Sequence, residues 1–227
     1  MLQNAVENSG DARGYMLERL NGFYEKILAQ ESVNPPFPLP QADQFEPLSY
    51  ENLHDEFKEL ITEPAIDLTQ LLGTRTGEMH IALSSNTLHK DFKPEDFSLH
   101  YQRSLYAAWQ SLIRETFQKL GKNINNLPDG IRAEAEEILA MRESIQHELK
   151  KIYQKKIDVV KIRIHGDYHL GQVLFTGKDL VIMDFEGNPA RSYSERRLKR
   201  SPLRDVAAMI RSLHYAAYEA LFMNNQI

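Results

Sequence analysis

The chain has 227 residues, with 27 basic and 32 acidic side chains, a formal net charge of -5 and 42% apolar residues. That apolar share is enough to bury a core, whereas general binding to nucleic acid calls for a basic surplus that is absent. Cysteine is also absent, which excludes disulfides, thiolate zinc sites and cysteine nucleophiles and fits a reducing compartment. No apolar run approaches the ~18 residues of a membrane helix, and the N-terminus lacks the apolar core of a signal peptide. We therefore expect a cytoplasmic protein with neither nucleic acid nor membrane as a partner.

The first part of the chain is predicted to form two helices separated by a connector. Apolar residues recur at helical spacing over residues 11–30 and again over residues 64–83, where Gly73 and Gly77 weaken the pattern without ending it. Residues 31–48 contain five prolines, too many for a helix or an interior strand. This segment is therefore predicted to be extended.

The middle of the chain is predicted to be helical over residues 98–120 and 131–156, and residues 159–164 are predicted to form a strand because β-branched side chains crowd together there. Ser201 and Pro202 suit the start of a last helix. The side chains predicted to face the core in these three helices are Tyr101, Leu105, Ala108, Leu112 and Leu120, then Ile138, Met141, Ile145, Leu149 and Ile152, then Val206, Met209, Ile210, Leu213 and Ala217.

The stretch over residues 165–186 carries the clearest chemical signal. It contains two short apolar strands joined at Gly177, with Asp167 before the first strand and Asp184 at the end of the second. In kinases of the protein-kinase type, a loop of the form H-x-D-x-x-x-x-N places an aspartate at the acceptor hydroxyl and an amide five residues later on the metal. Asp167 and Gln172 have this spacing. The pattern therefore indicates phosphoryl transfer, with Asp167 as the catalytic base.

The same stretch holds the candidate ligands of Mg²⁺. A second aspartate, on a turn of the D-F-G kind, has to hold this ion against the phosphates, because a hard cation prefers carboxylate oxygens. Asp184, in M-D-F-E-G, is placed for that role. Gln172 keeps the carbonyl oxygen of the usual Asn and adds one methylene, so coordination through it is retained. Glu186 either supplies a further oxygen to a metal, grips a substrate hydroxyl or faces solvent.

Several polar residues are candidates for supporting roles. His165 and His169 are expected to hold the catalytic loop, and Asp205, early in the last helix, to buttress it from below. Six cations lie between residues 191 and 204 against one anion. Guanidinium groups match phosphate oxygens in pairs, so Arg191 and Arg197 are the candidates for phosphate contacts, while most of this basic run is expected to pair with nearby carboxylates in a solvated loop.

Two other interpretations compete with a kinase. Asp167 could be an ordinary turn aspartate, although its interval to Gln172, the hairpin and Asp184 together argue against this. His165, Asp167 and His169 alternate, so on an extended segment they would face one way, as in a zinc or iron hydrolase. A third nitrogen or sulfur ligand is hard to nominate, because the other histidines are scattered and cysteine is absent.

Other signatures of nucleotide binding are missing from the sequence. The dinucleotide fingerprint G-x-G-x-x-G does not occur, and Gly166 and Gly171 are followed by Gln-Val where a P-loop needs Lys and Ser or Thr. A complete kinase of this type also needs an N-terminal β-lobe with a phosphate-covering loop and a strand lysine, and nothing ahead of residue 165 supplies them. We expect the C-terminal lobe alone, weak or inactive with ATP as an isolated chain.

With these motifs in place, the chain resembles the maltokinases, including the kinase domain found fused to trehalose synthase. The similarity extends over nearly the whole chain and is most specific over residues 194–212. The generic loop motif would also fit aminoglycoside, choline or methylthioribose kinases, which share the fold. The segments that carry the resemblance are H-G-D-Y-H-L-G-Q-V-L, M-D-F-E-G-N-P-A-R, S-E-R-R-L-K-R-S-P-L-R-D-V-A-A-M-I-R-S and L-L-G-T-R-T-G-E-M-H-I-A-L.

The resemblance implies a mostly helical α+β fold, namely a protein-kinase-like (aminoglycoside phosphotransferase-like) C-terminal lobe with a small catalytic β-hairpin. It implies a helix and proline-rich connector over residues 1–48, a helical subdomain over 49–160, and the catalytic loop, metal-binding turn and last helix over 161–227. The implied reaction moves the γ-phosphoryl group of ATP to the anomeric hydroxyl of maltose, with Mg²⁺ as cofactor and trehalose synthase as a fused or associated partner. Another small-molecule substrate, or a non-catalytic remnant that scaffolds trehalose synthase, remains open.

Overall fold

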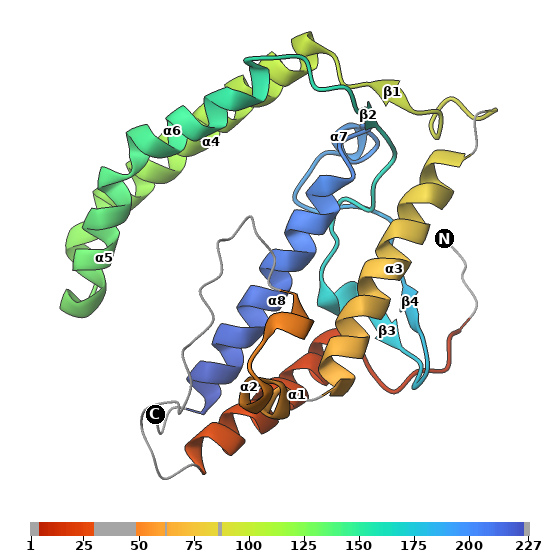
Figure 1. Ribbon diagram of the computed structural model, residues 1–227. Helices are drawn as coiled ribbons and strands as arrows, with labels where there is room; N and C mark the ends of the chain where they lie inside the picture. The colour runs from red at the N-terminus through yellow and green to blue at the C-terminus, as the bar shows by residue number, and fades with distance from the viewer. Residues whose placement is uncertain (1–4, 30–48, 62, 86–87, 225–227) are drawn as a thin grey trace. The chain divides into compact units, whose positions relative to one another are not determined.

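The structure is a computed structural model that describes residues 5–29, 49–61, 63–85 and 88–224 (Figure 1). The proline-rich connector predicted over residues 31–48 lies outside these ranges. The chain divides into two compact units, one made of residues 1–93 and 162–227 and the other of residues 94–161. None of the described helices is both long enough and apolar enough to cross a lipid bilayer.

Unit 1 is built around three long helices and one hairpin. Helices α1 (Ala12–Leu28) and α8 (Leu203–Met223) pack along each other, and α3 (Glu63–Ser85) packs on the hairpin formed by β3 (Val173–Phe175) and β4 (Leu180–Ile182) (Figure 1). The two strands are antiparallel, with Leu174 opposite Val181. Shorter helical segments of this unit are η1 (Tyr50–Asn52), α2 (Asp55–Leu60), η4 (Leu170–Gln172) and α7 (Tyr193–Arg196).

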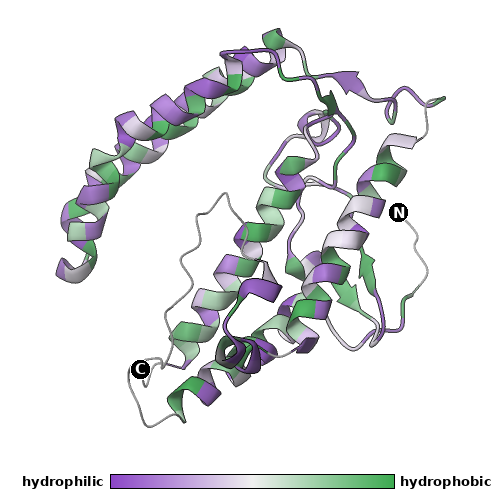
Figure 2. Ribbon diagram, in the orientation of Figure 1, coloured by the Kyte–Doolittle hydropathy of each residue, from purple (hydrophilic) through white to green (hydrophobic). Residues whose placement is uncertain are grey.

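The core of unit 1 lies between these three helices and the hairpin. Figure 2 shows both strands as apolar, and their first residues, Val173 and Leu180, are buried. Apolar side chains from α1, α3, η4, both strands and α8 bury together, which supplies most of the driving force for folding of the unit. The buried cluster consists of Ala12, Met16, Leu68, Leu72, Met79, Tyr168, Leu170, Val173, Leu180, Met209 and Ala216.

The hydroxyl of Tyr168 forms a hydrogen bond inside this core. Its side chain is buried, and burial raises the pKa of its hydroxyl. Its oxygen lies 2.8 Å from that of Thr76, which itself donates to the carbonyl of Leu72. Because a hydroxyl has a single hydrogen, Tyr168 must be the donor in this pair. Both hydroxyls therefore have a hydrogen-bond partner inside the core.

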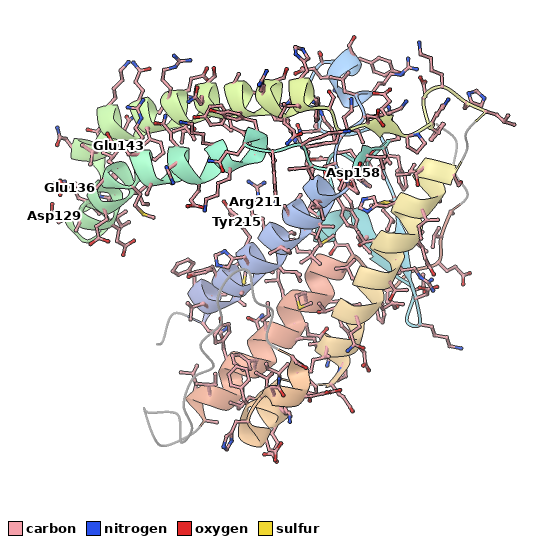
Figure 3. All side chains as sticks on the ribbon, turned by 45° about the horizontal axis from the view of Figure 1, so that its top comes forward. Asp129, Glu136, Glu143, Asp158, Arg211 and Tyr215 are labelled. Atoms are coloured by element: carbon pink, nitrogen blue, oxygen red, sulfur yellow. The ribbon has the colours of Figure 1, made fainter. Side chains whose placement is uncertain are left out.

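Unit 2 is a helical hairpin closed by a short sheet. Helix α4 (Leu99–Asn123) packs against α5 (Asp129–Ala140) and α6 (Arg142–Lys150), and β1 (Glu95–Asp96) pairs with β2 (Val160–Lys161). The 3₁₀ segments η2 (Ile124–Asn126) and η3 (Lys151–Tyr153) complete it. Its exposed carboxylates include those of Asp129, Glu136, Glu143 and Asp158 (Figure 3).

Most of the helix predictions are confirmed to within a few residues. The predicted 11–30, 64–83 and 98–120 correspond to α1, α3 and α4. Gly73 and Gly77 both lie on the exposed face of α3, so they do not interrupt its buried stripe. Asp11 caps α1 by accepting from the backbone N of Gly14 at 2.8 Å, and Ser98 caps α4 in the same way.

Three predictions about secondary structure and burial are wrong. The helix expected over residues 131–156 ends at Ala140 and begins again at Arg142, with η3 following. The strand expected over residues 159–164 is limited to β2, followed by an isolated bridge from Ile162 to Arg200. Some side chains predicted to face the core are exposed, because a stripe drawn one position away fits the same periodicity. These are Ala108, Leu112, Ile138, Met141 and Ile210.

The polar anchor of unit 2 is Gln102, which is completely buried. Its amide nitrogen donates to the carbonyl of Ile152 and, at 2.8 Å, to that of Lys155. Its amide oxygen accepts from the backbone N of Ile157 at 3.3 Å. One side chain thereby satisfies three backbone groups of the segment that leads from α6 to β2.

We predict that Gln102→Ala lowers the free energy of unfolding of unit 2 by about 3 kcal/mol, because it leaves buried carbonyls and an amide without partners. Urea unfolding followed by circular dichroism measures the change. Gln118→Ala is the control, since Gln118 is exposed on the same helix. Equal stability of the two variants would show that Gln102 contributes no more than a surface glutamine.

Candidate functional site

The loop over residues 165–172, which the sequence predicts to be catalytic and which is called the catalytic loop below, is held from one side by Asp205. This is the third residue of α8, and its carboxylate is buried. This carboxylate accepts from the backbone N of His165 at 2.8 Å and from that of Gly166 at 3.0 Å. It also accepts from Nε2 of His80, on α3, at 3.0 Å. A buried charge is tolerated only when it is well paired, and these three donors provide the pairing. Asp205 thus ties α3 and α8 to the start of the loop.

His165 holds the loop from inside the core. Its side chain is buried, with its ring against those of Tyr168 and Phe185. Its Nε2 donates to the carbonyl of Met183 at 2.8 Å, and its Nδ1 accepts from the backbone N of Asp167 at 3.3 Å. Both ring nitrogens are therefore used within the chain, so the geometry does not fit His165 as a ligand of a hydrolytic metal.

Asp167 lies at the surface of the unit on the next turn of the loop and is half-buried. Its Oδ1 accepts from the side-chain amide of Asn188 at 3.1 Å. Asn188 follows the turn at Asp184 and was not among the residues predicted from the sequence. Its neighbours Gly187 and Pro189 mark a turn, and this was the only signal available for it in the sequence.

The second aspartate and the amide are brought together as the motif predicts. Nε2 of Gln172, at the end of η4, donates to Oδ2 of Asp184 at 3.0 Å. The backbone N of Met183 donates to the carbonyl of Gln172 at 3.0 Å, which extends the hairpin ladder to this point. Asp184 has φ of 62° and Gly187 has φ of 74°. A positive φ in a residue other than glycine costs energy and is typical of functional turns, where it aims a side chain outward.

Glu186 and His169 lie beside this arrangement without joining it. Glu186 is exposed. The ring of His169 caps η4, accepting from the backbone N of Gly171 at 3.1 Å. Among the described residues, no group of three or more His, Asp and Glu side chains is placed to hold a metal ion. A role for Glu186 as a metal ligand stays a prediction.

The hairpin is fixed in place by an ion pair with α3. Arg75 donates through Nε to Oδ1 of Asp179 at 2.7 Å and through Nη2 to Oδ2 at 2.8 Å. These bonds hold the pKa of Asp179 below its usual value. On the other edge, Ser9 and Gly10 exchange backbone hydrogen bonds with Phe175, so the segment before α1 extends the hairpin. The strands that carry the site are thus supported on both sides.

The two arginines predicted to contact phosphate have partners elsewhere in the described structure. Arg197 forms an ion pair with Asp91 and thereby lowers the pKa of this carboxyl. Arg191 lies 3.8 Å from Glu195, a loose contact between exposed side chains. Phosphate contacts by Arg191 and Arg197 remain a prediction. Arg196 supports the turn after Asp184, since it donates to the carbonyls of Arg191 at 2.9 Å and Pro189 at 3.1 Å.

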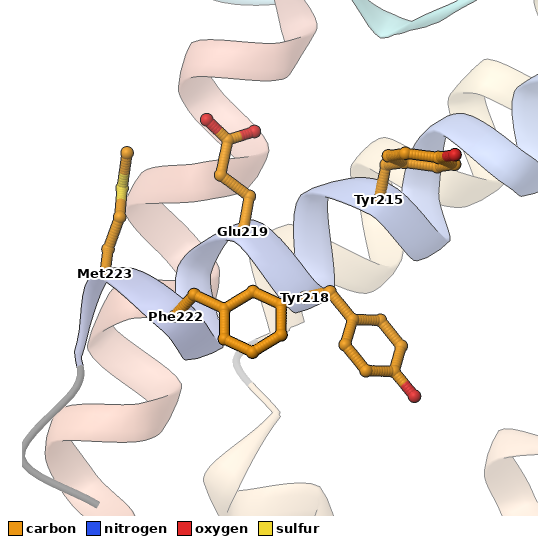
Figure 4. Close-up of a pocket in the computed structure, with 5 residues that line it drawn as sticks. All are labelled: Tyr215, Tyr218, Glu219, Phe222 and Met223. Carbon is orange, nitrogen blue, oxygen red and sulfur yellow. The ribbon is translucent and has the colours of Figure 1, made fainter. Parts of the chain in front are cut away.

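Two apolar hollows lie in unit 1, and neither is lined by Asp167, Gln172 or Asp184. One, of about 510 Å³, lies on α8 beside Tyr215, Tyr218, Glu219, Phe222 and Met223 (Figure 4). Arg211 lies over the ring of Tyr215 at the start of this face (Figure 3). The other, of about 490 Å³, lies between α1, α3 and α8. The candidate site is therefore an exposed loop and turn, separate from both hollows.

Comparison with known proteins finds sequence similarity to glucosamine kinases, which phosphorylate a sugar. No family model matches the chain. Glucosamine kinase of Streptacidiphilus jiangxiensis is 26% identical over 164 residues, which make up 72% of this chain and 34% of that protein. Glucosamine kinase of Mycolicibacterium smegmatis is 47% identical over 57 residues, or 25% of this chain and 14% of that protein. The chain thus spans about a third or less of the length of these curated relatives.

Solved structures of glucosamine kinases also resemble the fold of this chain. A crystal form of glucosamine kinase matches with a TM-score of 0.65 at 20% identity, covering 96% of this chain and 40% of that one. A glucosamine kinase solved with glucosamine, ADP and inorganic phosphate matches with a TM-score of 0.62 at 20% identity, covering 96% and 43%. The kinase-like, mostly helical fold expected from the sequence agrees with this likeness. The aminoglycoside phosphotransferase subtype and the relation to maltokinases remain predictions.

We predict that Asp205→Asn lowers the free energy of unfolding by about 3 kcal/mol, because the new NH₂ group faces donors where the carboxylate accepted them. Chemical unfolding measures this loss, and hydrogen exchange at the amides of His165 and Gly166 is expected to accelerate in parallel. Asp67→Asn, at an exposed position of α3, is the matched control. Unchanged protection of the two amides would contradict the role given to Asp205.

Proposed function

We propose that this chain is the C-terminal lobe of an ATP-dependent sugar kinase and that the full-length kinase transfers the γ-phosphoryl group of ATP to a sugar hydroxyl. The observation that carries the proposal is the placement of Asp167 and the Gln172–Asp184 pair on one short loop and hairpin. The likeness to glucosamine kinases, one of them solved with glucosamine and ADP, supports the same reaction.

In this proposal, Asp167 accepts the proton of the sugar hydroxyl while the hydroxyl oxygen bonds to the γ-phosphorus and the bond to the β-phosphate oxygen breaks, releasing ADP. Phosphoryl transfer needs little covalent help from a protein, so the main contributions are alignment and charge neutralisation. The hydrogen bonds of Asp205 and His165 to the loop supply the alignment, since they fix the backbone on which Asp167 stands.

The residues at the turn fit a magnesium ion. The carboxylate of Asp184 and the amide oxygen of Gln172 are hard oxygen donors, and Mg²⁺ commonly takes one or two carboxylates together with substrate phosphates and water. Their side chains already meet, through Nε2 of Gln172 and Oδ2 of Asp184 at 3.0 Å, so the amide has to turn over to present its oxygen to the ion. The bound ion would neutralise charge on the phosphates. Glu186 is the further candidate for this shell, on the basis of its position alone.

For the acceptor we propose maltose, phosphorylated at its anomeric hydroxyl, on the strength of the maltokinase resemblance over residues 194–212. The same resemblance supports association with trehalose synthase, either fused or as a separate partner. Glucosamine is the second candidate, because both curated relatives are glucosamine kinases. A scaffold without catalysis is the alternative in a different class.

The acceptor is tested by incubating the full-length protein with ATP, Mg²⁺ and either maltose or glucosamine, with ADP release and the phosphorylated sugar both measured. We expect maltose 1-phosphate as the product. Faster turnover of glucosamine would overturn the choice of maltose while leaving the sugar kinase in place. Phosphorylation of neither sugar, nor of a wider sugar panel, would favour the scaffold.

We further predict that Asp167→Asn lowers the rate by about 10²- to 10⁴-fold while the unfolding midpoint changes little, since the substitution removes a proton acceptor from an accessible position. Asp158→Asn makes the same change at an exposed residue of unit 2 and is expected to leave the rate unchanged. A rate for Asp167→Asn within tenfold of the parent would remove Asp167 from the mechanism.

A further inference from the structure

The turn at Gly187, Asn188 and Pro189 lies directly against the catalytic loop. Gly166 has φ of 86° and Gly187 has φ of 74°, a conformation that side-chain-bearing residues rarely adopt. A Cβ atom added to Gly166 would lie 3.6 Å from the Cα atom of Gly187. The two backbone segments therefore approach closely, and this brings the side chain of Asn188 to Asp167.

The amide of Asn188 is held in one orientation. Its Oδ1 accepts from the backbone N of Ala190 at 2.9 Å, and its Nδ2 donates to Oδ1 of Asp167 at 3.1 Å. A backbone N–H can only donate, so the amide oxygen has to face Ala190 and the NH₂ group has to face Asp167. The backbone carbonyl of Asn188 also accepts from the backbone N of Arg191 at 3.0 Å. The donor offered to Asp167 is therefore built into the turn.

Arg196 holds the same turn from its other side. Its guanidinium donates to the carbonyls of Pro189 and Arg191. Its Cβ, Cγ and Cδ atoms lie 3.3 to 3.7 Å from where a Cβ atom of Gly187 would be, so this side chain packs closely against the turn. Asn188 is consequently clamped between Arg196 and the catalytic loop, with little freedom to turn its amide away.

We propose that Asn188 is a positioning residue for the phosphoryl transfer proposed above, on which this inference rests. By donating to Oδ1 of Asp167, the amide fixes the carboxylate plane and leaves Oδ2 to accept the proton of the sugar hydroxyl. A neutral donor suits this task, because it orients the carboxylate while leaving its negative charge uncancelled. The residue acts through Asp167 and contacts neither the phosphate nor the metal.

Two substitutions separate positioning of Asp167 from simple anchoring of the turn. Asn188→Asp keeps the oxygen that accepts from Ala190 but places a second carboxylate oxygen beside Asp167. Asn188→Ala removes both hydrogen bonds. Positioning predicts that kcat falls about 100-fold in Asn188→Asp and about tenfold in Asn188→Ala, with KM for ATP and sugar changed less than about threefold in both.

The measurements are steady-state kinetics, thermal unfolding and crystal structures of the full-length protein and its variants. Asn126→Asp adds the same charge at an exposed position of unit 2 and is expected to keep the parental rate. The opposite order, with Asn188→Asp near the parental rate and Asn188→Ala impaired and less thermally stable, would overturn the proposal in favour of turn anchoring.

Whether the proposed function itself fails is decided by a separate measurement, the sugar kinase activity of the unmutated protein. If the parent phosphorylates no sugar, the crystal structures alone decide the role of Asn188. An Asp167 carboxylate bonded to Asn188 in the parent and rotated away in Asn188→Asp would support positioning. An Asp167 side chain in the same rotamer in both proteins would overturn it.

Discussion

The candidate site depends on one buried carboxylate. Asp205 has only 1% of its surface exposed, and it accepts from two backbone amides of the catalytic loop and from His80. The loop amides belong to residues that form no regular ladder, so without this carboxylate they would be buried and unpaired. The buried oxygens of Asp205 likewise need these donors as hydrogen-bond partners. Each side of this contact therefore stabilises the other, and together they join α3, α8 and the loop.

The opposite side of the loop is shaped by backbone conformation. Gly166, Asp184 and Gly187 all have positive φ, and they lie where the loop and the turn after β4 approach each other. Glycine adopts this conformation at little cost, whereas Asp184 does so under strain. The hairpin ladder, which reaches Met183, and the bond from Gln172 oppose that strain. Rigid elements thus hold an outward-facing carboxylate at the point where a metal ion and phosphate would approach.

Sequence reasoning recovered what local spacing encodes. Most helices followed from apolar stripes and caps. Gln172 and Asp184 followed from the spacing of a known motif, and their side chains meet at 3.0 Å.

The sequence did not reveal features that depend on packing between neighbouring elements. Leu112 and Ile113 fit the same stripe equally well, and only packing against α5 and α6 decides that Ile113 is the buried one. Asn188 lay in a turn whose approach to the catalytic loop no local pattern reveals. Arg191 and Arg197 were candidates by charge alone, and the carboxylates that pair with them became visible only in three dimensions.

The distribution of charge explains why the two aspartates of the site stay available. Each is approached by a neutral amide, Asp167 by Asn188 and Asp184 by Gln172. Several arginines of unit 1 pair with carboxylates away from the site, as Arg75 does with Asp179 and Arg197 with Asp91. A guanidinium at the site would favour the ionised aspartate but would also compete with a cation and suppress proton uptake. An amide orients the carboxylate without either effect. Under the proposed function, in which one aspartate holds Mg²⁺ and the other takes a proton, amides therefore serve the site better than the abundant basic side chains nearby.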